Sequence, residues 1–435
     1  MLKITRLKSA SRSGDYYGKD DYYVTGEANK PGLLWGGKGA DALGLEGLTD
    51  PKDFKKLLQG INPDASGPAI SKLDEALRKA ATGEGEGEKP PATPKHAPGW
   101  DMTFSAPKSF SIMALVAGDD RLQDLHNRSV QRAMDYAEKH FSVTRTRDGA
   151  GGVRESITGN LVYATTEHGM SRAGDPTMHN HVVVMNTTQT EAGKWQALET
   201  RHLYKHMNLL GQIYQAELQI GARELGYNVV QGKTAGTWEI AEFANGRTAQ
   251  ALNSSVGPAS QLIEIFSQRH ALITERLEAE TLTKGRDLTP AERQAVILRD
   301  RPSKLGSPRA EVQATWRAIA EKEGVDLKAI EQGSLERTTG QNLTAQRIGK
   351  IGLMTRLSGF VDEKVFGRLR DVTADFSLKV GLRNQEQRST VFTPHAVIAD
   401  AMKYNGNLHR IDTYLESGFF QRAAGQVGRL RQGRD

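Results

Sequence analysis

Hydrophobic and polar positions repeat with two different periods along the first 230 residues. Residues 157–167 and 179–188 are rich in β-branched side chains, which predicts two strands. The turn-forming residues between them, GMSRAGDPTM, predict that these strands form a hairpin. Apolar residues recur at helical spacing over 69–82, 118–141 and 199–226. The pattern therefore predicts an α+β fold.

Helical patterns continue through the rest of the chain. The segment TPAERQAVILRDR predicts a helix in which Thr289 is the N-cap, Pro290 stands at the first helical position and Glu292 closes a capping box. Residues 307–323, which open with Ser-Pro, predict another helix. Beyond them the chain is a glycine-punctuated helical stretch. We therefore expect the C-terminal part to be mainly helical.

Composition shifts indicate where the chain divides. Residues 83–99 combine a Gly-Glu alternation with four prolines and predict an exposed loop that interrupts a domain. We expect an α+β domain over 1–330 and a smaller, mainly helical, basic segment over 331–435. Residues 301–435 carry 22 Lys and Arg against 15 Asp and Glu, whereas residues 1–300 carry 36 against 37. Any nucleic-acid groove in the first 300 residues must therefore be local.

Overall composition narrows the class of protein. The net charge of +6 indicates a polyanionic partner only weakly. The chain contains no cysteine, which excludes disulfides, thiolate zinc sites and cysteine nucleophiles. No apolar run is long enough to predict a transmembrane helix, and the basic N-terminus lacks the apolar stretch of a secretory signal. These features fit a protein of the bacterial cytoplasm.

Three of the 11 histidines lie within 14 positions: His168, His179 and His181. Residues two apart on a strand point to the same face, so His179 and His181 project together while Asn180 points away. The predicted hairpin brings His168 beside them. A single histidine is usually structural, but three imidazoles around one point form an open site for a Lewis-acid metal that polarises a phosphoryl oxygen.

Two other metal motifs fit the sequence less well. A cupin-type site requires a glutamate shortly after the H-x-H pair, and the residues that follow are VVVMN. His202 and His206 are four apart on a predicted helix but lack the glutamate of an H-E-x-x-H motif. We interpret that pair as an ordinary helix face.

Tyrosines cluster near the N-terminus in GDYYGKDDYYV, which holds Tyr16, Tyr17, Tyr22 and Tyr23. Adjacent side chains cannot both face one core, so packing explains this cluster poorly. It could stack on bases as a surface patch. Alternatively, a tyrosine phenol can attack a phosphodiester and form a 5′-phosphotyrosyl bond. A phenol has a pKa near 10 and needs a metal or a base to lose its proton, and the histidine cluster offers that help.

One acid and one lysine complete the candidate chemistry. Asp101, in GWDMTFSAPKS, could accept the second N–H of a metal-binding histidine or help to deprotonate the tyrosine. Lys108, seven residues later, could meet a DNA phosphate. Taken alone, both residues would be ordinary surface or loop positions.

Together these segments resemble the conjugative relaxases of F-plasmid type (the MobF class) within the HUH endonuclease superfamily. The resemblance rests on GDYYGKDDYYV, WGGKGADALGLEG, GWDMTFSAPKS and the H-x₁₀-H-x-H pattern that ends at His181, and it spans most of residues 1–230. It implies a five-stranded antiparallel sheet, the HUH palm, with flanking helices and with later helices that close over single-stranded DNA. Asn180 departs from the family, which has a hydrophobic residue at that position.

The resemblance also implies roles for individual residues. Tyr16 matches the initiating nucleophile and Tyr17 its neighbour, while Tyr22 and Tyr23 match the second pair, associated with later strand transfer. Asp101 matches the family's histidine-orienting or proton-accepting acid. The implied cofactor is one divalent ion. Imidazole ligands suit Mn²⁺, Zn²⁺, Ni²⁺ or Co²⁺ on chemical grounds, and availability favours Mg²⁺ or Mn²⁺.

The activity implied is site- and strand-specific nicking of single-stranded DNA at a plasmid origin of transfer, followed by transfer and rejoining. Implied partners are relaxosome accessory proteins and the coupling protein of a type IV secretion system. A rolling-circle replication initiator shares HUH chemistry, but its tyrosine follows the histidines, whereas here the tyrosines come first. A non-catalytic single-stranded DNA-binding factor is the other alternative.

Proteins of this type usually continue into a helicase. Residues 391–416 resemble the stretch that precedes the helicase motor in longer relatives, and the sequence holds no GxxxxGK[ST] phosphate loop. We therefore expect the sequence as given to end within the linker before such a motor.

Overall fold

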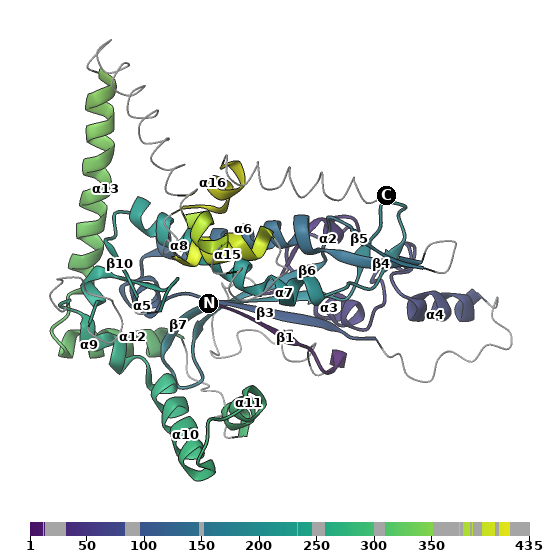
Figure 1. Cartoon of the computed structure of the whole chain (residues 1–435), viewed down its shortest axis with the longest axis horizontal. Coiled ribbons are helices and arrows are strands. Elements are labelled where there is room, and N and C mark those ends of the chain that lie inside the picture. The colour runs from purple at the N-terminus through teal and green to yellow at the C-terminus, as the bar shows by residue number, and fades with distance from the viewer. Residues whose placement is uncertain are drawn as a thin grey trace.

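The centre of the molecule is a five-stranded antiparallel sheet with the strand order β1-β3-β7-β6-β2 (Figure 1). The strands are β1 (Leu2–Arg6), β3 (Gly99–Ser105), β7 (Pro176–Met185), β6 (Tyr163–Met170) and β2 (Leu34–Gly36). The α+β fold with this sheet and flanking helices, which the resemblance implies, is confirmed. The computed structural model describes residues 1–11, 13, 32–82, 96–147, 152–232, 234–245, 257–299, 309–350, 374, 377–382, 385, 394–404 and 409–417.

Alternating side chains of the central strands build one core on each face of the sheet. On one face Phe104 of β3 and Val182 of β7 pack in the larger core, with helices that follow β3 in the chain. These are α5 (Lys108–Ile112), the π-helix η1 (Met113–Ala117), α6 (Asp120–Phe141) and α8 (Met207–Glu224). On the other face Val183 packs with Phe54 of α3 (Pro51–Leu58) and with α2 (Lys38–Asp41). This end of β7 is therefore buried on both sides.

Short ribbons and further helices surround this centre. The described ribbons pair β4 (Val143–Arg147) with β5 (Val153–Ile157), β8 (Thr188–Gln189) with β9 (Trp195–Gln196), and β10 (Val229–Gln231) with β11 (Trp238–Ile240). The remaining helices include α4 (Lys72–Thr82), α7 (Arg201–Lys205), the 3₁₀ helix η2 (Ala241–Phe243), α9 (Ser260–Ile265), α10 (Gln268–Lys284), α11 (Pro290–Arg299), α12 (Arg309–Lys322) and α13 (Leu327–Lys350). Helices α10 and α11 project from the body, and the C-terminal part of α13 extends away from it (Figure 1). None of the described helices is both long and apolar enough to cross a membrane.

Several predicted helices match the structure closely. The helix expected over 118–141 is α6, and the one expected over 69–82 is α4. The capping box that begins α11 is confirmed: the hydroxyl of Thr289 accepts from the backbone N–H of Glu292 at 3.3 Å, and the Glu292 carboxylate accepts from the N–H of Thr289 at 2.8 Å. These local signals act within one turn of helix, which explains why the sequence alone locates them.

Two predicted elements differ from the structure. The strand expected over 157–167 is interrupted, because β5 ends at Ile157 and β6 begins at Tyr163. Between them Gly159 adopts a left-handed conformation with φ 72°, and the Asn160 amide donates to the carbonyl of Gln189 at 2.7 Å. The helix expected over 199–226 is two helices, α7 and α8, which meet at His206. The loop expected over 83–99 lies outside the described residues as far as 95, and β3 begins at Gly99.

The last described helices, α15 (Pro394–Tyr404) and α16 (Ile411–Glu416), fold back onto the first part of the chain. Ile398 and Tyr414 are fully buried in the same core as α6 and α8. Arg410 forms ion pairs with Glu217 and Glu224 of α8, each at 3.0 Å. The domain boundary near residue 330 stays a prediction, but helices on both sides of it share one hydrophobic core.

Candidate metal centre

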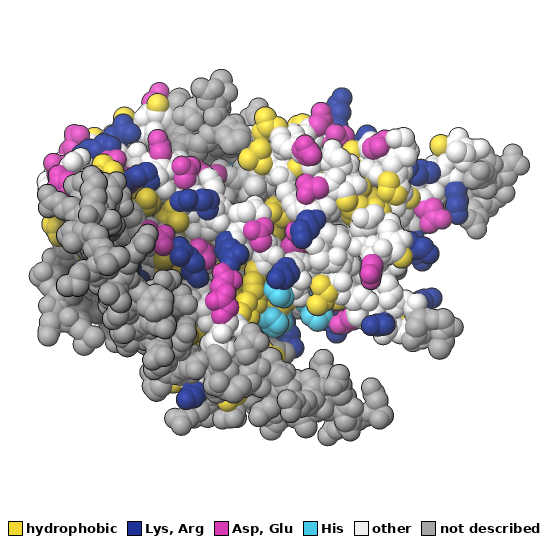
Figure 2. Space-filling model, turned by 90° about the horizontal axis from the view of Figure 1, so that it is seen from above, with side chains coloured by type: hydrophobic (Ala, Val, Ile, Leu, Met, Phe, Trp, Pro, Cys, Tyr) yellow, Lys and Arg dark blue, Asp and Glu magenta, His cyan; other side chains and the backbone are white. Residues whose placement is uncertain are grey.

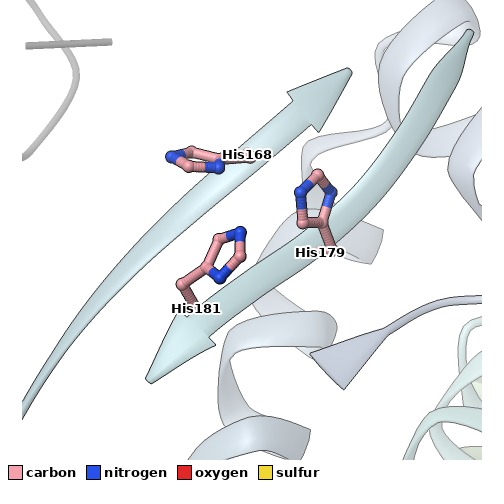
Figure 3. A group of neighbouring side chains, drawn as sticks. All are labelled: His168, His179 and His181. Carbon is pink, nitrogen blue, oxygen red and sulfur yellow. The ribbon is translucent and has the colours of Figure 1, made fainter. Parts of the chain in front are cut away.

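Three histidines meet on the two central strands of the hairpin (Figure 3). His168 lies near the end of β6, directly opposite His179 of β7 in the antiparallel register, while His181 stands opposite Thr166. Because His179 and His181 are two residues apart on the strand, their rings lie on the same face of the sheet, and the His168 ring lies on that face as well. One ligand nitrogen from each ring lies within 4.8 Å of the other two. The structure thus brings together the three side chains that the sequence singles out.

The outer nitrogens of two of these rings are held by acceptors. Nδ1 of His179 donates to the carbonyl oxygen of Thr177 at 2.9 Å. Nδ1 of His181 donates to both carboxylate oxygens of Asp101, at 2.9 and 2.8 Å. Since Nδ1 carries the proton in both rings, the lone pair of each Nε2 is available to an ion. This is the arrangement that orients metal-binding histidines in proteins.

Burial keeps the imidazoles of His168 and His179 in the neutral form that binds metal ions. Desolvation, with a smaller effect of neighbouring His181, lowers the pKa of His179 to about 4. Burial also lowers the pKa of His168 well below its ordinary value, again with help from the other two rings. Both rings are therefore neutral at physiological pH. A site of neutral imidazole donors with oriented Nε2 atoms fits a divalent transition-metal ion.

Asp101 reaches His181 because of the register between β3 and β7. Thr103 lies directly opposite His181, so Asp101, two residues earlier on the same face of β3, is its diagonal neighbour. The hydroxyl of Thr103 donates to Asp101 at 3.3 Å. The Asp101 side chain is nearly buried, with the residue 8% exposed. Of the two roles that the sequence left open for Asp101, this geometry favours the orientation of a histidine.

Lys108 has contacts that the sequence did not predict. Its ammonium group donates to the carbonyl of Pro176 at 2.9 Å and to the hydroxyl of Thr177 at 3.0 Å. Burial lowers the pKa of Lys108 to about 8, although the nearby carboxylates of Asp175 and Glu239 oppose this shift. In the structure Lys108 therefore anchors the start of the strand that carries His179, and its contact with a DNA phosphate stays a prediction.

The N-terminal tyrosines Tyr16, Tyr17, Tyr22 and Tyr23 lie outside the described residues. Their place in the chain is nevertheless informative. Strand β1 pairs with β3, and its Thr5 stands directly opposite Asp101. The chain therefore leaves the sheet from the strand beside the one that carries the acidic partner of His181.

Asp175 is a site-adjacent residue that the sequence did not reveal. Its carboxylate accepts from the first two backbone N–H groups of α10, those of Gln268 at 3.3 Å and Arg269 at 3.0 Å. The turn between the two histidine-bearing strands thus caps a helix that projects from the body of the molecule. The Asp-Pro pair predicted a turn, but nothing in the sequence indicated a partner more than ninety residues away.

Away from the three histidines, we compared the surface charge and the contacts of two other histidines with those of this site. On the face shown in Figure 2, Lys and Arg side chains are interspersed with Asp and Glu, so the coloured residues form no uniform basic surface. Nε2 of His202 donates to the Glu155 carboxylate at 2.9 Å, and His206 stacks on Phe141 with ring centroids 4.3 Å apart. Among the residues that the structure describes, only His168, His179 and His181 form a group of three with metal-binding geometry.

An antiparallel palm with three converging imidazoles backed by an acid is the architecture that the resemblance to HUH endonucleases implies. A model of the TrwC relaxase family matches residues 7–323, and the chain belongs to this family. Two proteins named multifunctional conjugation protein TraI are similar to it. One, from Escherichia coli, is 34% identical over 78% of this chain, and the other, from E. coli strain K12, is 30% identical over 86%.

Solved structures of the conjugative relaxase TrwC also match. Its metal-free complex with oriT DNA is 31% identical and aligns with a TM-score of 0.59 over 75% of this chain and all of the TrwC chain. A metal-bound structure of the same complex gives the same values. This chain covers only 17% and 19% of the two TraI proteins. The family membership decides between the two HUH interpretations in favour of the relaxase.

Proposed function

We propose that this chain is a metal-dependent tyrosine nickase that cuts one strand of DNA at a plasmid origin of transfer and later rejoins it. The observation that carries the proposal is the convergence of His168, His179 and His181, with Asp101 behind His181. The similarity to a relaxase solved with oriT DNA supports the same substrate class. A protein that only bound single-stranded DNA would have no need of this site.

The three histidines would hold one divalent ion through nitrogen atoms that face one another. Such an ion supplies neutralisation of the negative charge that develops on a non-bridging phosphate oxygen. Asp101 keeps the His181 ring in one orientation and one tautomer, and the Thr177 carbonyl does the same for His179. For the identity of the ion we propose Mg²⁺ or Mn²⁺, with Zn²⁺, Ni²⁺ and Co²⁺ as alternatives that suit imidazole donors.

Tyr16 is the proposed nucleophile. Its phenolic oxygen would bond to the scissile phosphorus as the bond from phosphorus to the 3′ oxygen breaks. The phenol loses its proton, the 3′ oxygen gains one, and the 5′ phosphate stays joined to the tyrosine. From Thr5, opposite Asp101, to Tyr16 the chain has eleven residue steps, which span at most about 40 Å when fully extended and less here because residues 10, 11 and 13 are helical. That length is ample to bring the phenol to the histidines.

The stored phosphotyrosyl ester allows the strand to be rejoined by the reverse attack of a 3′ hydroxyl. Tyr17 is the proposed neighbour of the nucleophile, and Tyr22 and Tyr23 are proposed for the later strand-transfer step. Lys108 remains a proposed phosphate contact if the strand start moves on DNA binding. Relaxosome accessory proteins and a type IV secretion coupling protein are the proposed protein partners, and the bacterial cytoplasm is the proposed compartment.

The test is a nicking assay with single-stranded oligonucleotides that span the origin of the host plasmid, labelled at the 3′ end, with Mg²⁺ or Mn²⁺. We expect an SDS-resistant protein–DNA band, because the new ester is covalent. Tyr16→Phe should reduce this band by at least about 100-fold, since the variant lacks the attacking oxygen. Tyr17→Phe is the matched control and should retain most of the product.

Each alternative gives a different result. A non-catalytic DNA-binding factor would shift the oligonucleotide in a native gel but give no SDS-resistant band. If Tyr16→Phe kept the full amount of adduct and another tyrosine variant lost it, the nickase would stand with a different initiating residue. If every tyrosine variant kept the adduct, the tyrosine mechanism would be wrong.

A further inference from the structure

Behind the three histidines, on the opposite face of the same strands, lies a buried polar side chain. Asn180 stands between His179 and His181 in β7, and its side chain points toward α6 rather than toward the proposed metal. It is 4% exposed, in a face of β7 otherwise occupied by Met178, Val182 and Val184. A buried amide in an apolar face is costly unless it is fully hydrogen-bonded, so its partners carry information.

The amide of Asn180 is paired on both sides. Nε2 of His126, in α6, lies 3.0 Å from the Asn180 Oδ1, and the Asn180 amide donates to Oδ1 of Asn127 at 2.9 Å. The amide of Asn127 in turn donates to the Glu167 carboxylate of β6 at 3.0 Å. Behind them, the hydroxyl of Tyr214 in α8 lies 2.9 Å from Nδ1 of His126. The network therefore joins both histidine-bearing strands to α6 and α8.

One arrangement of protons satisfies the inner part of this network. The Asn180 oxygen can only accept, so Nε2 of His126 must carry the proton, and Nδ1 then accepts from the Tyr214 hydroxyl. Burial lowers the pKa of His126 to about 3, which keeps the ring neutral in this tautomer. His126 and Tyr214 are both completely buried. The chain of donors and acceptors thus runs in one direction, from α8 through α6 to β7.

The register puts this network directly behind the metal ligands. Asn180 pairs with Glu167 across the two strands, between the pair of His168 with His179 and the pair of Thr166 with His181. The residues that alternate with the imidazoles along both strands are therefore tied to the helices on the rear face. A shift of β6 against β7, or a change in their pleat, would move the imidazoles and break these hydrogen bonds together.

We infer that Asn180 and His126 are positioning residues that hold the three imidazoles in metal-binding geometry through a hydrogen-bond network on the rear face of the sheet, which is buried at His126, Asn180 and Tyr214 and reaches the surface at Asn127. This inference rests on the proposed function, because it assumes that the histidines bind a divalent ion. It gives Asn180 a structural role of its own, although its side chain does not face the proposed metal. Its oxygen fixes the tautomer of His126, and its amide links β7 to Asn127 and so to β6.

The test compares Mn²⁺ affinity by titration calorimetry, and the visible absorption spectrum of the Co²⁺ form, in wild-type protein and Asn180→Leu. Leucine has a similar size but leaves His126 and Asn127 without their central partner. We expect affinity to fall by about 10- to 100-fold, the range seen when residues that support metal ligands are lost. The Co²⁺ spectrum should change as well, because it reports the arrangement of the ligands.

Val182→Ala is the matched control, since it damages the packing of the same face of the same strand without touching the network. It should lower the melting temperature and leave metal affinity and the Co²⁺ spectrum unchanged. Tyr214→Phe removes a single hydroxyl with little change of shape and should weaken Mn²⁺ binding by a few-fold. This variant keeps the test decisive if Asn180→Leu fails to fold.

Two results would overturn the inference while leaving the metal site intact. One is a less stable Asn180→Leu with wild-type metal affinity and spectrum. The other is a loss of affinity in Val182→Ala as large as in Asn180→Leu, because general damage to the strand would then suffice. If wild-type protein itself bound no Mn²⁺ or Co²⁺, the proposed metal site would fail first, and the inference with it.

Discussion

Among the residues that the structure describes there are two clusters of three histidines, and only one has the geometry of a metal site. In the first, His168, His179 and His181 have ring centroids 5.0 to 5.4 Å apart. In the second, the ring centroid of His395, in α15, lies 5.1 Å from that of His206 and 6.0 Å from that of His140. Closely approaching histidine rings therefore occur in both clusters, and ring proximity by itself does not identify a metal site.

What differs is the direction of the nitrogen atoms and what holds them. In the first cluster the ligand nitrogens converge, and hydrogen bonds to Asp101 and the Thr177 carbonyl fix two of the rings. In the second cluster the rings pack around Phe141, on which His206 is stacked. Among the described residues no carboxylate is hydrogen-bonded to these rings. The comparison shows that ring orientation, set by adjacent strands and their acceptors, separates a candidate metal site from aromatic packing.

The largest effect expected from this comparison is on metal binding. His179→Ala combined with His181→Ala should weaken Mn²⁺ binding by more than about 100-fold, because loss of two ligands exceeds the loss of any supporting residue. His206→Ala combined with His395→Ala should leave Mn²⁺ affinity unchanged. Titration calorimetry on both double variants measures this. Equal losses in the two proteins, or none in either, would remove the distinction between the clusters.

A smaller effect should follow from removing the acceptor of His181. In Asp101→Ala the Nδ1 atom of His181 loses both carboxylate contacts, and we expect Mn²⁺ affinity to fall by about 10- to 100-fold. Asp101→Asn retains an oxygen that can accept from Nδ1 and should lose less. The same calorimetric titration ranks the two variants. Asparagine and alanine variants with identical affinities would show that the hydrogen bond does not orient the ring.

The smallest effect concerns the pH dependence of the second cluster. Burial lowers the pKa of both His206 and His395 to about 4, and neighbouring His140, His202 and Lys205 add to the shift. Both pKa values lie below the ordinary 6.5, so the stabilisation is complete above about pH 6.5 and is lost as pH falls towards 4. Protonation of these rings should thus loosen the packing of α15.

Thermal unfolding at several pH values can measure this loss. Between about pH 7.5 and about pH 5 the melting temperature of the wild type should fall more than that of a His206→Asn, His395→Asn double variant, which has no imidazole to protonate at these positions. Parallel pH curves for the two proteins would show that these histidines do not couple α15 to proton concentration.

The sequence was most informative where the determining interactions are local. The hairpin and the two-residue spacing of His179 and His181 depend only on strand periodicity and turn formers, and the structure has both. The capping box of Thr289 and Glu292 acts within one helical turn. In contrast, the strand predicted through 158–162 is absent, because Gly159 and the side chain of Asn160 turn the chain there.

Long-range contacts could not be predicted in this way. The sequence suggested Asp101 as a partner for a histidine but could not say which, since the answer depends on the register of β3 against β7. It suggested a phosphate contact for Lys108, whereas the ammonium is bonded to Pro176 and Thr177. It gave no role to Asn180, because the partners of this side chain on α6 are more than fifty positions away.

The return of α15 and α16 to the first part of the chain has a practical consequence for anyone who shortens this protein. A version that stopped after α12 would uncover the side of α8 against which α15 packs, together with apolar surface that now meets Ile398, Met402 and Tyr414. Newly exposed apolar surface of this kind promotes self-association. Preparations intended for crystallisation or for kinetics should therefore be less prone to self-association when residues 394–417 are retained.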